Sequence, residues 1–369
     1  MDALCEDAVA EILARLDAVS VLRCRAVCKS RRRIATGSSF LAAHAARSPR
    51  EMLVTTQSHT VSAIPLPVDP ADDGATHFSL DPADGGTGRR RILCDPTQVS
   101  TTGTVTSCVL LFSLHGLLVF QERPGLYIIC NPVTRQWTNL PPLGPEPCFS
   151  AFPCGFYFHS SSGEYRLLCH ADEARWGDAA PWSCKDKDYY YVLAAGGTQP
   201  RRLPRGPANG PGRLGHDCPV AHGEIIYWAS LHPEATRAGK ILAFNTASET
   251  FRLMSRPSSV TRAALLELDG FLCAVTMPCA TRLDIWALQD HEAERWTLRL
   301  RMEVPPPRCI ASGTFSVTTA ISAGDGSILI GNPYYPLVLL CDIKGKRVLK
   351  EMRSSAGCSS KGASTAGAT

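Results

Sequence analysis

Three short stretches of this chain carry residue types that could do chemistry. His291-Glu292-Ala293-Glu294-Arg295 approaches the His-Glu-x-x-His spacing that brings two histidines to one zinc ion, but arginine replaces the second histidine. Gly85-Gly86-Thr87-Gly88 has the glycine content of a phosphate-binding loop and lacks the Lys-Ser/Thr of a P-loop. Cys24 and Cys28 are one helical turn apart with no second ligand pair nearby, which favours packing over metal binding. None of the three predicts a metal or cofactor site.

Catalysis and several classes of ligand are also not expected from the rest of the chain. The sequence has no Gly-x-Ser-x-Gly nucleophile elbow, and nothing in it brings its serines and histidines together. The net charge of +4 is small for 369 residues, so nucleic acid binding is not indicated. No run reaches the roughly 18 apolar residues of a membrane span. We therefore expect no catalysis by this chain alone and no cofactor.

The cysteines indicate a compartment. The chain has 16 of them, placed singly in apolar runs, with no signal peptide and no Asn-x-Ser/Thr acceptor. This pattern predicts free, buried thiols in a reducing compartment, the cytoplasm and/or the nucleus. The basic run Lys29–Arg33 fits a nuclear localisation patch, although the solvated end of a helix is the favoured interpretation.

The first 45 or so residues predict short helices that need a partner. One helix would carry the apolar stripe Leu4, Val9, Ile12, Leu13 and Leu16. Ser20 is the expected N-cap of a second helix, which would carry Val21, Leu22, Cys24, Val27 and Cys28. Two or three helices of this length cannot bury so much apolar surface among themselves, so the segment reads as a docking module.

The same segment resembles the F-box motif. The matching residues are Leu4, Asp7, Ile12, Leu13, Arg15, Leu16, Leu22, Arg23, Cys24, Val27, Cys28 and Lys29. Cys5 and Asp17 stand where the family usually has proline, and Arg31 stands where it usually has tryptophan. The resemblance implies that residues 1–46 bind the adaptor subunit of an SCF-type cullin-RING ubiquitin ligase, and through it a cullin. The residues that it assigns to this docking surface are Leu4, Ile12, Leu13, Leu16, Leu22, Val27 and Cys28.

From about Arg50 the helical periodicity gives way to short β-type runs broken by glycine and proline. The runs repeat as units, each with a polar turn before an aromatic or apolar closing strand. The clear units are Leu114–Pro142, His222–Pro257, Leu266–Pro305 and Ile321–Met352, and the weaker ones are Gly163–Pro204 and Met52–Leu93. A period of about 50 residues built from short antiparallel strands predicts a β-propeller of about six kelch-like blades. The repeated aromatic residues Trp137, Phe251 and Trp296 would pack between blades.

The run Asn131–Pro141 resembles the F-box-associated repeat region of plant proteins, as does Leu283–Trp286 followed by Trp296. The expected fold class is thus multidomain α plus all-β, with a short N-terminal helical F-box (1–46) followed by a propeller of kelch-like blades (50–353). The small polar residues of 354–369 predict a disordered tail.

Two longer loops are candidates for a client-binding surface, because binding residues tend to lie on loops of a rigid scaffold. Ala171–Asp188 carries Trp176 and Trp182, and Pro200–His216 carries arginines. Aromatic and arginine side chains are frequent anchors of interfaces. The predicted client residues are Trp176, Trp182, Arg201, Arg202 and Arg205. The alternative is that both tryptophans fold back onto the propeller and that the arginines are only solvated.

These features together predict a non-catalytic substrate-recognition adaptor, which docks through its F-box and presents an unidentified client protein on its propeller. The alternative is a propeller scaffold, or a glycan- or small-molecule-binding propeller, whose degenerate F-box does not engage a ligase. A catalytic propeller of the oxidase type would need clustered metal ligands, which the sequence does not show.

Overall fold

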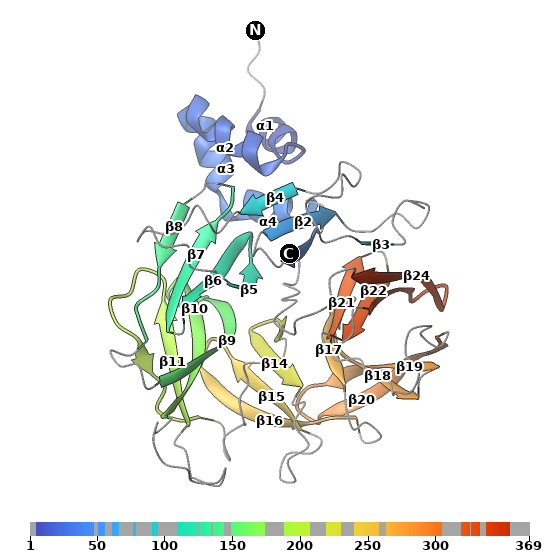
Figure 1. Ribbon diagram of the computed structural model, residues 1–369. Helices are drawn as coiled ribbons and strands as arrows, with labels where there is room; N and C mark the ends of the chain where they lie inside the picture. Colours follow the sequence, from blue (N-terminus) through green and yellow to red (C-terminus); the bar gives the residue numbers. More distant parts are fainter. Residues whose placement is uncertain are drawn as a thin grey trace.

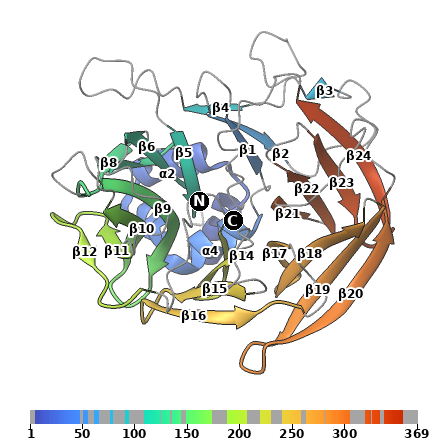
Figure 2. The same ribbon diagram turned by 60° about the horizontal axis from the view of Figure 1, so that its bottom comes forward.

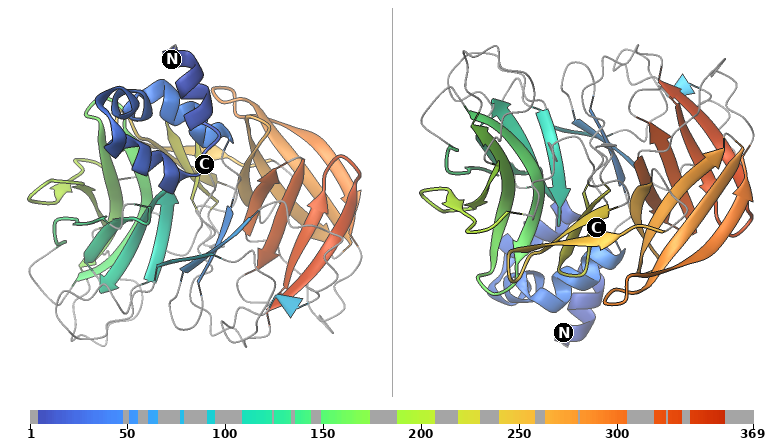
Figure 3. Two further views of the ribbon diagram at one scale, coloured as in Figure 1. Left: turned by 90° about the horizontal axis from the view of Figure 1, so that it is seen from above. Right: turned by 90° about the horizontal axis from the view of Figure 1, so that it is seen from below.

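The computed structural model is a ring of antiparallel sheets with four short helices at one end (Figure 1). Figure 2 shows the sheets arranged around the ring, and in Figure 3 the helices lie over one side of it. The residues that the structure describes are 5–47, 51–55, 61–65, 77–78, 91–94, 109–123, 125–133, 136–143, 149–173, 188–206, 219–229, 240–257, 263–279, 281–304, 319–324, 326–332 and 337–354.

The helices form a module with a small core of its own. They are α1 (Glu6–Leu13), α2 (Ala18–Val27), α3 (Lys29–Thr36) and α4 (Ser38–Arg47). Their buried side chains are Leu13, Ala14, Val21, Ala35 and Phe40. The helices expected from the apolar spacing therefore form, and they pack around one another.

The predicted N-cap of the second helix is wrong by three residues. Asp17 caps α2, because its Oδ1 atom accepts the backbone N–H of Ser20 at 2.9 Å. The Ser20 hydroxyl donates to the other carboxylate oxygen at 2.7 Å. These hydrogen bonds lower the pKa of the Asp17 carboxyl. A serine inside the first turn was mistaken for the cap because both residue types are good caps.

Five four-stranded blades make up the propeller. Blade 1 contains β5 (Val109–Leu114), β6 (Leu117–Arg123), β7 (Leu126–Asn131) and β8 (Gln136–Asn139). Blade 2 contains β9 (Phe149–His159), β10 (Glu164–Glu173), β11 (Asp188–Ala194) and β12 (Arg201–Arg202). Blade 3 contains β13 (Val220–His222), β14 (Ile225–Ala229), β15 (Lys240–Asn245) and β16 (Thr250–Ser255). Blade 4 contains β17 (Ala264–Leu268), β18 (Phe271–Cys279), β19 (Arg282–Asp290) and β20 (Arg295–Glu303). Blade 5 contains β21 (Thr319–Gly324), β22 (Ser327–Asn332), β23 (Leu337–Asp342) and β24 (Arg347–Ser354).

The segment before blade 1 contributes strands to two places. Strands β1 (Glu51–Thr55), β2 (Val61–Pro65) and β4 (Arg91–Cys94) form a three-stranded sheet between blades 5 and 1 (Figure 2). Strand β3 (His77–Phe78) pairs in parallel with the end of β24 and so joins blade 5. The expected β-propeller is confirmed, with five blades in place of about six, because the weak unit Met52–Leu93 divides its strands between the three-stranded sheet and blade 5. The kelch-like blade type stays a prediction.

Apolar side chains fill the spaces between consecutive blades. One cluster joins blades 1 and 2, a second joins blades 2 and 3, a third joins blades 3 and 4, and a fourth joins blades 4 and 5. The repeated aromatic residues divide between these interfaces and the surface. The ring centroids of Phe251 and of Tyr190 in the preceding blade are 4.7 Å apart. The indole N–H of Trp296 donates a hydrogen bond to the Ser255 carbonyl of the preceding blade at 2.9 Å. Trp137 is 36% exposed and contacts Phe120 within its own blade.

The polar turns before the closing strands share one construction, as the repeat pattern predicts. Asn245 accepts the backbone N–H groups of Ala247 and Ser248, at 3.0 and 2.8 Å. Asp290 and Asp342 accept equivalent N–H groups in blades 4 and 5. The residue just before the closing strand then has a positive φ, at Glu249 (52°), Glu294 (50°) and Lys346 (52°). A side-chain oxygen thus fixes the chain reversal in each of these blades.

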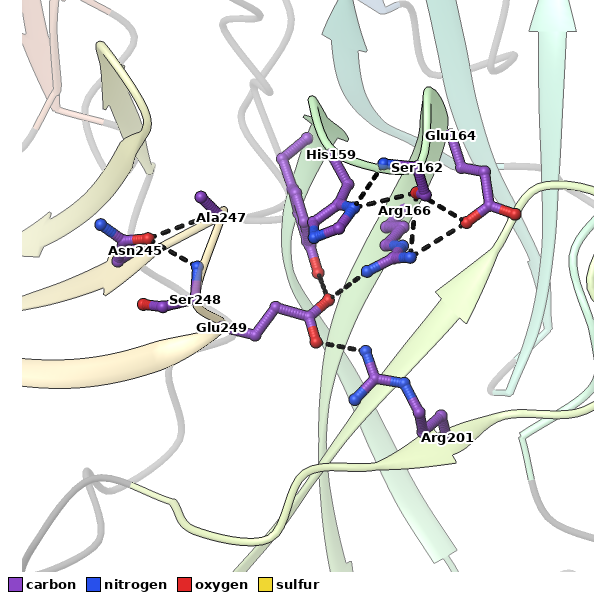
Figure 4. A network of polar contacts seen from close by, with 10 residues as sticks. His159, Ser162, Glu164, Arg166, Arg201, Asn245, Ala247, Ser248 and Glu249 are labelled. Carbon is purple, nitrogen blue, oxygen red and sulfur yellow. Dashed lines mark hydrogen bonds and ion pairs between the residues drawn. The ribbon is translucent and has the colours of Figure 1, made fainter.

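Glu249 uses this turn to reach back to blade 2 (Figure 4). Its carboxylate accepts the Tyr157 hydroxyl at 2.8 Å and Arg166 Nη1 at 2.7 Å, and it also pairs with Arg201. Burial alone would raise the pKa of Glu249, but the hydrogen bonds from Arg201, Tyr157 and Arg166 outweigh it and lower the pKa. Glu294 repeats the contact one blade later, with Ser255 N–H at 2.7 Å and Arg252 at 3.2 Å.

Replacing Glu249 by glutamine should destabilise the propeller by about 2 kcal/mol, because the largely buried Arg166 would face a neutral amide. Urea unfolding measures this destabilisation as the difference in the free energy of unfolding between the native chain and the variant. Glu292→Gln is the matched control, since Glu292 is an exposed turn residue of blade 4. It should change the unfolding free energy by less than about 0.5 kcal/mol. Equal losses in the two variants would show that Glu249 is not an inter-blade tie.

The contribution of Glu249 should also depend on pH in a defined direction. Its pKa in the folded chain lies below the ordinary value of 4.5, so ionisation favours the folded state above that value. The stability difference between the native chain and Glu249→Gln should therefore be constant near neutral pH. It should shrink as the pH falls below the ordinary value and through the lowered pKa. Urea titrations at a series of pH values measure the difference, and a gap that widens in acid would contradict this assignment.

Candidate functional site

The helical module exposes large apolar side chains that its own core leaves uncovered. Ile12 is 50% exposed, Leu16 36%, Val19 39% and Val27 63%. The first three lie around the junction of α1 and α2, and Val27 ends α2. Several large apolar side chains exposed on so small a module are typical of an interaction site.

The structure sorts the predicted docking residues into three groups. Ile12, Leu16, Val27 and Cys28 are exposed, and Leu22 is half-buried. Leu13 is 3% exposed and lies inside the helical core, so it can support docking by holding α1 in place. Leu4 lies outside the described residues. Val19 was missed by the sequence pattern, because it falls on the first turn of α2, outside the predicted stripe of the first helix.

An open hollow of about 500 Å³ lies between α2 and α3. Its lining combines apolar and cationic residues: Leu22, Arg25, Ala26, Cys28, Lys29, Arg32 and Thr36. Cys28 caps α3 through a 3.5 Å contact from the Arg31 N–H to its sulfur. The exposed surface of the module is thus apolar around α1 and Val27, and basic along α3.

Polar contacts hold the module in shape from several sides. Arg47 on α4 pairs with Glu11 on α1 at 2.9 Å, and hydrogen bonds from Arg47 and Arg15 lower the pKa of Glu11. Arg25 donates to the Ala35 carbonyl at 2.7 Å, which ties α2 to α3. His44 Nε2 lies 2.8 Å from the Leu16 carbonyl. These contacts fix Leu16 and its neighbours on a defined surface.

The predicted client residues are only partly described. Trp176 and Trp182 lie outside the described residues. Arg201 pairs with Glu249 of the next blade, and its role in client binding stays a prediction. The Arg202 guanidinium lies 3.8 Å over the ring of Tyr189, and Arg205 is exposed. The interaction of Arg201 escaped the sequence pattern because its partner lies 48 residues away, in a turn of another blade.

One cluster has the residue types of a hydrolytic site, and its geometry does not form one. Ser162 lies between His159 Nδ1 and a Glu164 carboxylate oxygen, each at 2.9 Å (Figure 4). His159 Nδ1 also accepts the Ser162 backbone N–H at 3.2 Å, so this nitrogen is occupied as a turn acceptor. Glu164 contacts the serine and Arg166 in place of the imidazole that it would have to orient. The three residues close the β9–β10 hairpin.

The other candidate chemistry falls in ordinary structural positions. His291 lies in the β19–β20 turn, as expected, and burial lowers the pKa of its imidazole. Among the described residues, no three His, Cys, Asp or Glu side chains gather as metal ligands. The nine cysteines whose side chains the structure describes are free thiols, and five of them are buried. Within the described part of the chain, no helix is long and apolar enough to cross a bilayer.

Comparison with protein families matches two models to this chain. The model described as "F-box associated beta propeller domain" matches residues 72–350, and the model described as "F-box domain" matches residues 1–42. An F-box protein of Arabidopsis thaliana is 22% identical over 312 residues, which cover 79% of this chain and 77% of that protein. The matched ranges coincide with the helical module and the propeller.

Solved structures give more distant likenesses. A nidogen/laminin complex aligns with 12% identity and a TM-score of 0.45 over 83% of this chain and 94% of that chain. An oligogalacturonate lyase of Vibrio parahaemolyticus aligns with 10% identity and a TM-score of 0.44 over 67% of this chain and 65% of that chain. Both TM-scores are low, so nothing about this chain is inferred from either structure.

Replacing Asp17 by alanine should loosen the start of α2, because the N-cap hydrogen bond from Ser20 is lost. The expected cost is about 1 kcal/mol of local stability. Hydrogen–deuterium exchange of the α2 amides measures it directly. Asp7→Ala is the control, because Asp7 lies in the first turn of α1. Its carboxylate interacts favourably with the helix dipole, and this interaction contributes about 0.3–1 kcal/mol. Unchanged exchange in Asp17→Ala would rule out the cap as a determinant of the module.

Proposed function

Because this chain belongs to the family of F-box-associated β-propeller domains, and an F-box model matches its helical module, we propose that it is a substrate-recognition adaptor. In this role the helical module binds the adaptor subunit of an SCF-type cullin-RING ubiquitin ligase. The propeller binds a client protein for ubiquitination. The cytoplasm and/or the nucleus is the proposed location, in keeping with the free thiols.

The observation that carries this proposal is the exposed apolar surface of the helical module. Among the described side chains of the module, five are buried in its core and three of these are larger than alanine, while Ile12, Leu16, Val19 and Val27 remain outside. Covering these four side chains would remove apolar surface from water at about 25 cal/mol per Å². Exposed apolar surface of this kind on a folded protein marks a site that a second protein covers in a complex.

The mechanism that follows is proximity. The helices and the propeller are parts of one chain, and Figure 3 shows the helices placed over one side of the ring. A client held on the propeller would be kept near the conjugating enzyme that the ligase recruits, which raises its effective concentration. The chain's own residues would supply binding and orientation, and the chemistry would belong to the other subunits.

The departures from the usual F-box pattern bear on docking in different ways. Asp17, in place of proline, caps α2 with two hydrogen bonds, so the entry into that helix is fixed by another means. Cys5 precedes α1 without a side-chain cap, so this entry has no such replacement. Arg31 is exposed on α3, where it adds charge and cannot supply the apolar area of a tryptophan.

Co-expression with the ligase adaptor subunit tests the proposal. The native chain should co-purify with it, and an Ile12→Asp/Leu16→Asp variant should not. Burying even one unpaired carboxylate in an apolar interface costs several kcal/mol, so the affinity should fall by about a thousandfold or more. Isothermal titration with the purified adaptor gives the affinity.

Leu298→Asp is the matched control, because Leu298 lies on β20 of the propeller and is 39% exposed, close to the 36% of Leu16. This variant should bind the adaptor as the native chain does. No complex with a folded native chain would contradict the proposal. It would instead favour a propeller that binds a glycan or another small molecule and carries a degenerate F-box.

A further inference from the structure

The outer edge of blade 2 carries arginine and tyrosine side chains that the proposed docking to a ligase does not use. It is formed by Tyr189 and Tyr191 on β11 and by Arg202 and Arg205 on and after β12. We name it the blade 2 edge. Tyrosine and arginine are the residue types that most often anchor protein interfaces.

Strand register places three of these residues on one face. Tyr191 is paired with Arg202, and Val192 with Arg201. Because side chains alternate along a strand, Arg202 shares a face with Tyr191 and Tyr189, while Arg201 points to the opposite face. The 3.8 Å separation of the Arg202 guanidinium from the Tyr189 ring agrees with this register. The alternation also explains why Arg201, and not Arg202, reaches Glu249 of blade 3.

The chain around Arg205 is anchored on both sides. The Leu203 N–H donates to the Tyr190 carbonyl at 2.8 Å, and the Leu203 side chain is 4% exposed. Gly206 lies against the Tyr190 ring so closely that an added Cβ would come within 3.0 Å of it. The exposed Arg205 is therefore presented from a backbone held between two packed residues.

The charges of the blade 2 edge are not balanced within the described part of the chain. Most other propeller arginines lie within ion-pair distance of a carboxylate: Arg166, Arg201, Arg252, Arg282, Arg295, Arg299, Arg301 and Arg347. Arg202 and Arg205 have no such partner among the described carboxylates. Glu249 is already paired with Arg166 and Arg201, and Arg166 also pairs with Glu164.

We infer that the blade 2 edge binds a carboxylate-rich peptide segment of the client protein. This inference rests on the proposed client-binding role of the propeller and adds the chemistry of what is bound. Stacking on Tyr189 holds the Arg202 guanidinium flat, which leaves its N–H edge for bidentate contact with a carboxylate. A stacked Arg202 and an exposed Arg205 three residues further along the chain suit an acidic segment. A nucleic acid would need more phosphate contacts for useful affinity at physiological salt.

Fluorescence anisotropy of the full chain with a fluorescein-labelled deca-glutamate peptide, at about 50 mM salt, tests the inference. The native chain should bind the peptide, and Arg202→Glu/Arg205→Glu should lower the affinity by about tenfold or more. Tyr189→Leu keeps both charges and removes the ring under Arg202, and it should lower the affinity by about threefold.

Arg123→Glu is the matched control, because Arg123 is exposed on β6 and also has no carboxylate partner among the described residues. It changes the net charge in the same direction and should alter the affinity by less than about twofold. Unchanged peptide binding in Arg202→Glu/Arg205→Glu would overturn the inference. So would a native chain that binds a ten-nucleotide single strand more tightly than the peptide.

Adaptor co-purification with the same variants keeps the two proposals apart. Arg202→Glu/Arg205→Glu should retain the ligase adaptor while losing the peptide. Peptide binding that depends on Arg202 and Arg205, in a native chain that forms no adaptor complex, would contradict the ligase role and leave the acidic-segment inference standing.

Discussion

Burial of apolar side chains between neighbouring blades is the constraint on which this structure depends. A four-stranded antiparallel sheet has two faces and can bury neither by itself. Here four apolar clusters each take side chains from two consecutive blades, from Val119 and Phe156 at one end of the series to Ile285 and Ile330 at the other. The polar ties follow from this arrangement. Glu249 and Glu294 reach the preceding blade only because burial has already brought the blades together.

The helical module departs from the same constraint, and this departure supports the proposed function. Its core is closed around Leu13, Val21 and Phe40, while Ile12 and Val27 stay at its surface. A similar contrast appears on the propeller, where most described arginines pair with a carboxylate, whereas Arg202 and Arg205 have no carboxylate partner among the described residues. In both places we propose that a partner protein binds side chains that remain exposed in the described part of the chain. The module would bind through apolar area, and the blade 2 edge through charge, so the two surfaces should respond differently to salt.

Much of this architecture could be predicted from the sequence, because the repeats reflect interactions between residues that are close together in the chain. The Asx turns at Asn245, Asp290 and Asp342 recur because each closing hairpin needs the same backbone hydrogen bonds, and the helices follow from apolar spacing. What could not be predicted depends on pairing between distant segments. Strand β3 joins blade 5 from a segment expected to form a separate blade, and Arg201 meets a glutamate of another blade. The site was predictable in type from the F-box resemblance. The burial of Leu13 and the exposure of Val19 depend on how the helices cross.

Hydrogen–deuterium exchange of the full chain, with and without the ligase adaptor subunit, tests the central claim most directly. Adaptor binding through the exposed apolar surface should slow exchange in α1 and α2, around Ile12, Leu16 and Val19, and leave the five blades unchanged. Protection that appears on the propeller strands while the helices exchange as before would contradict the account.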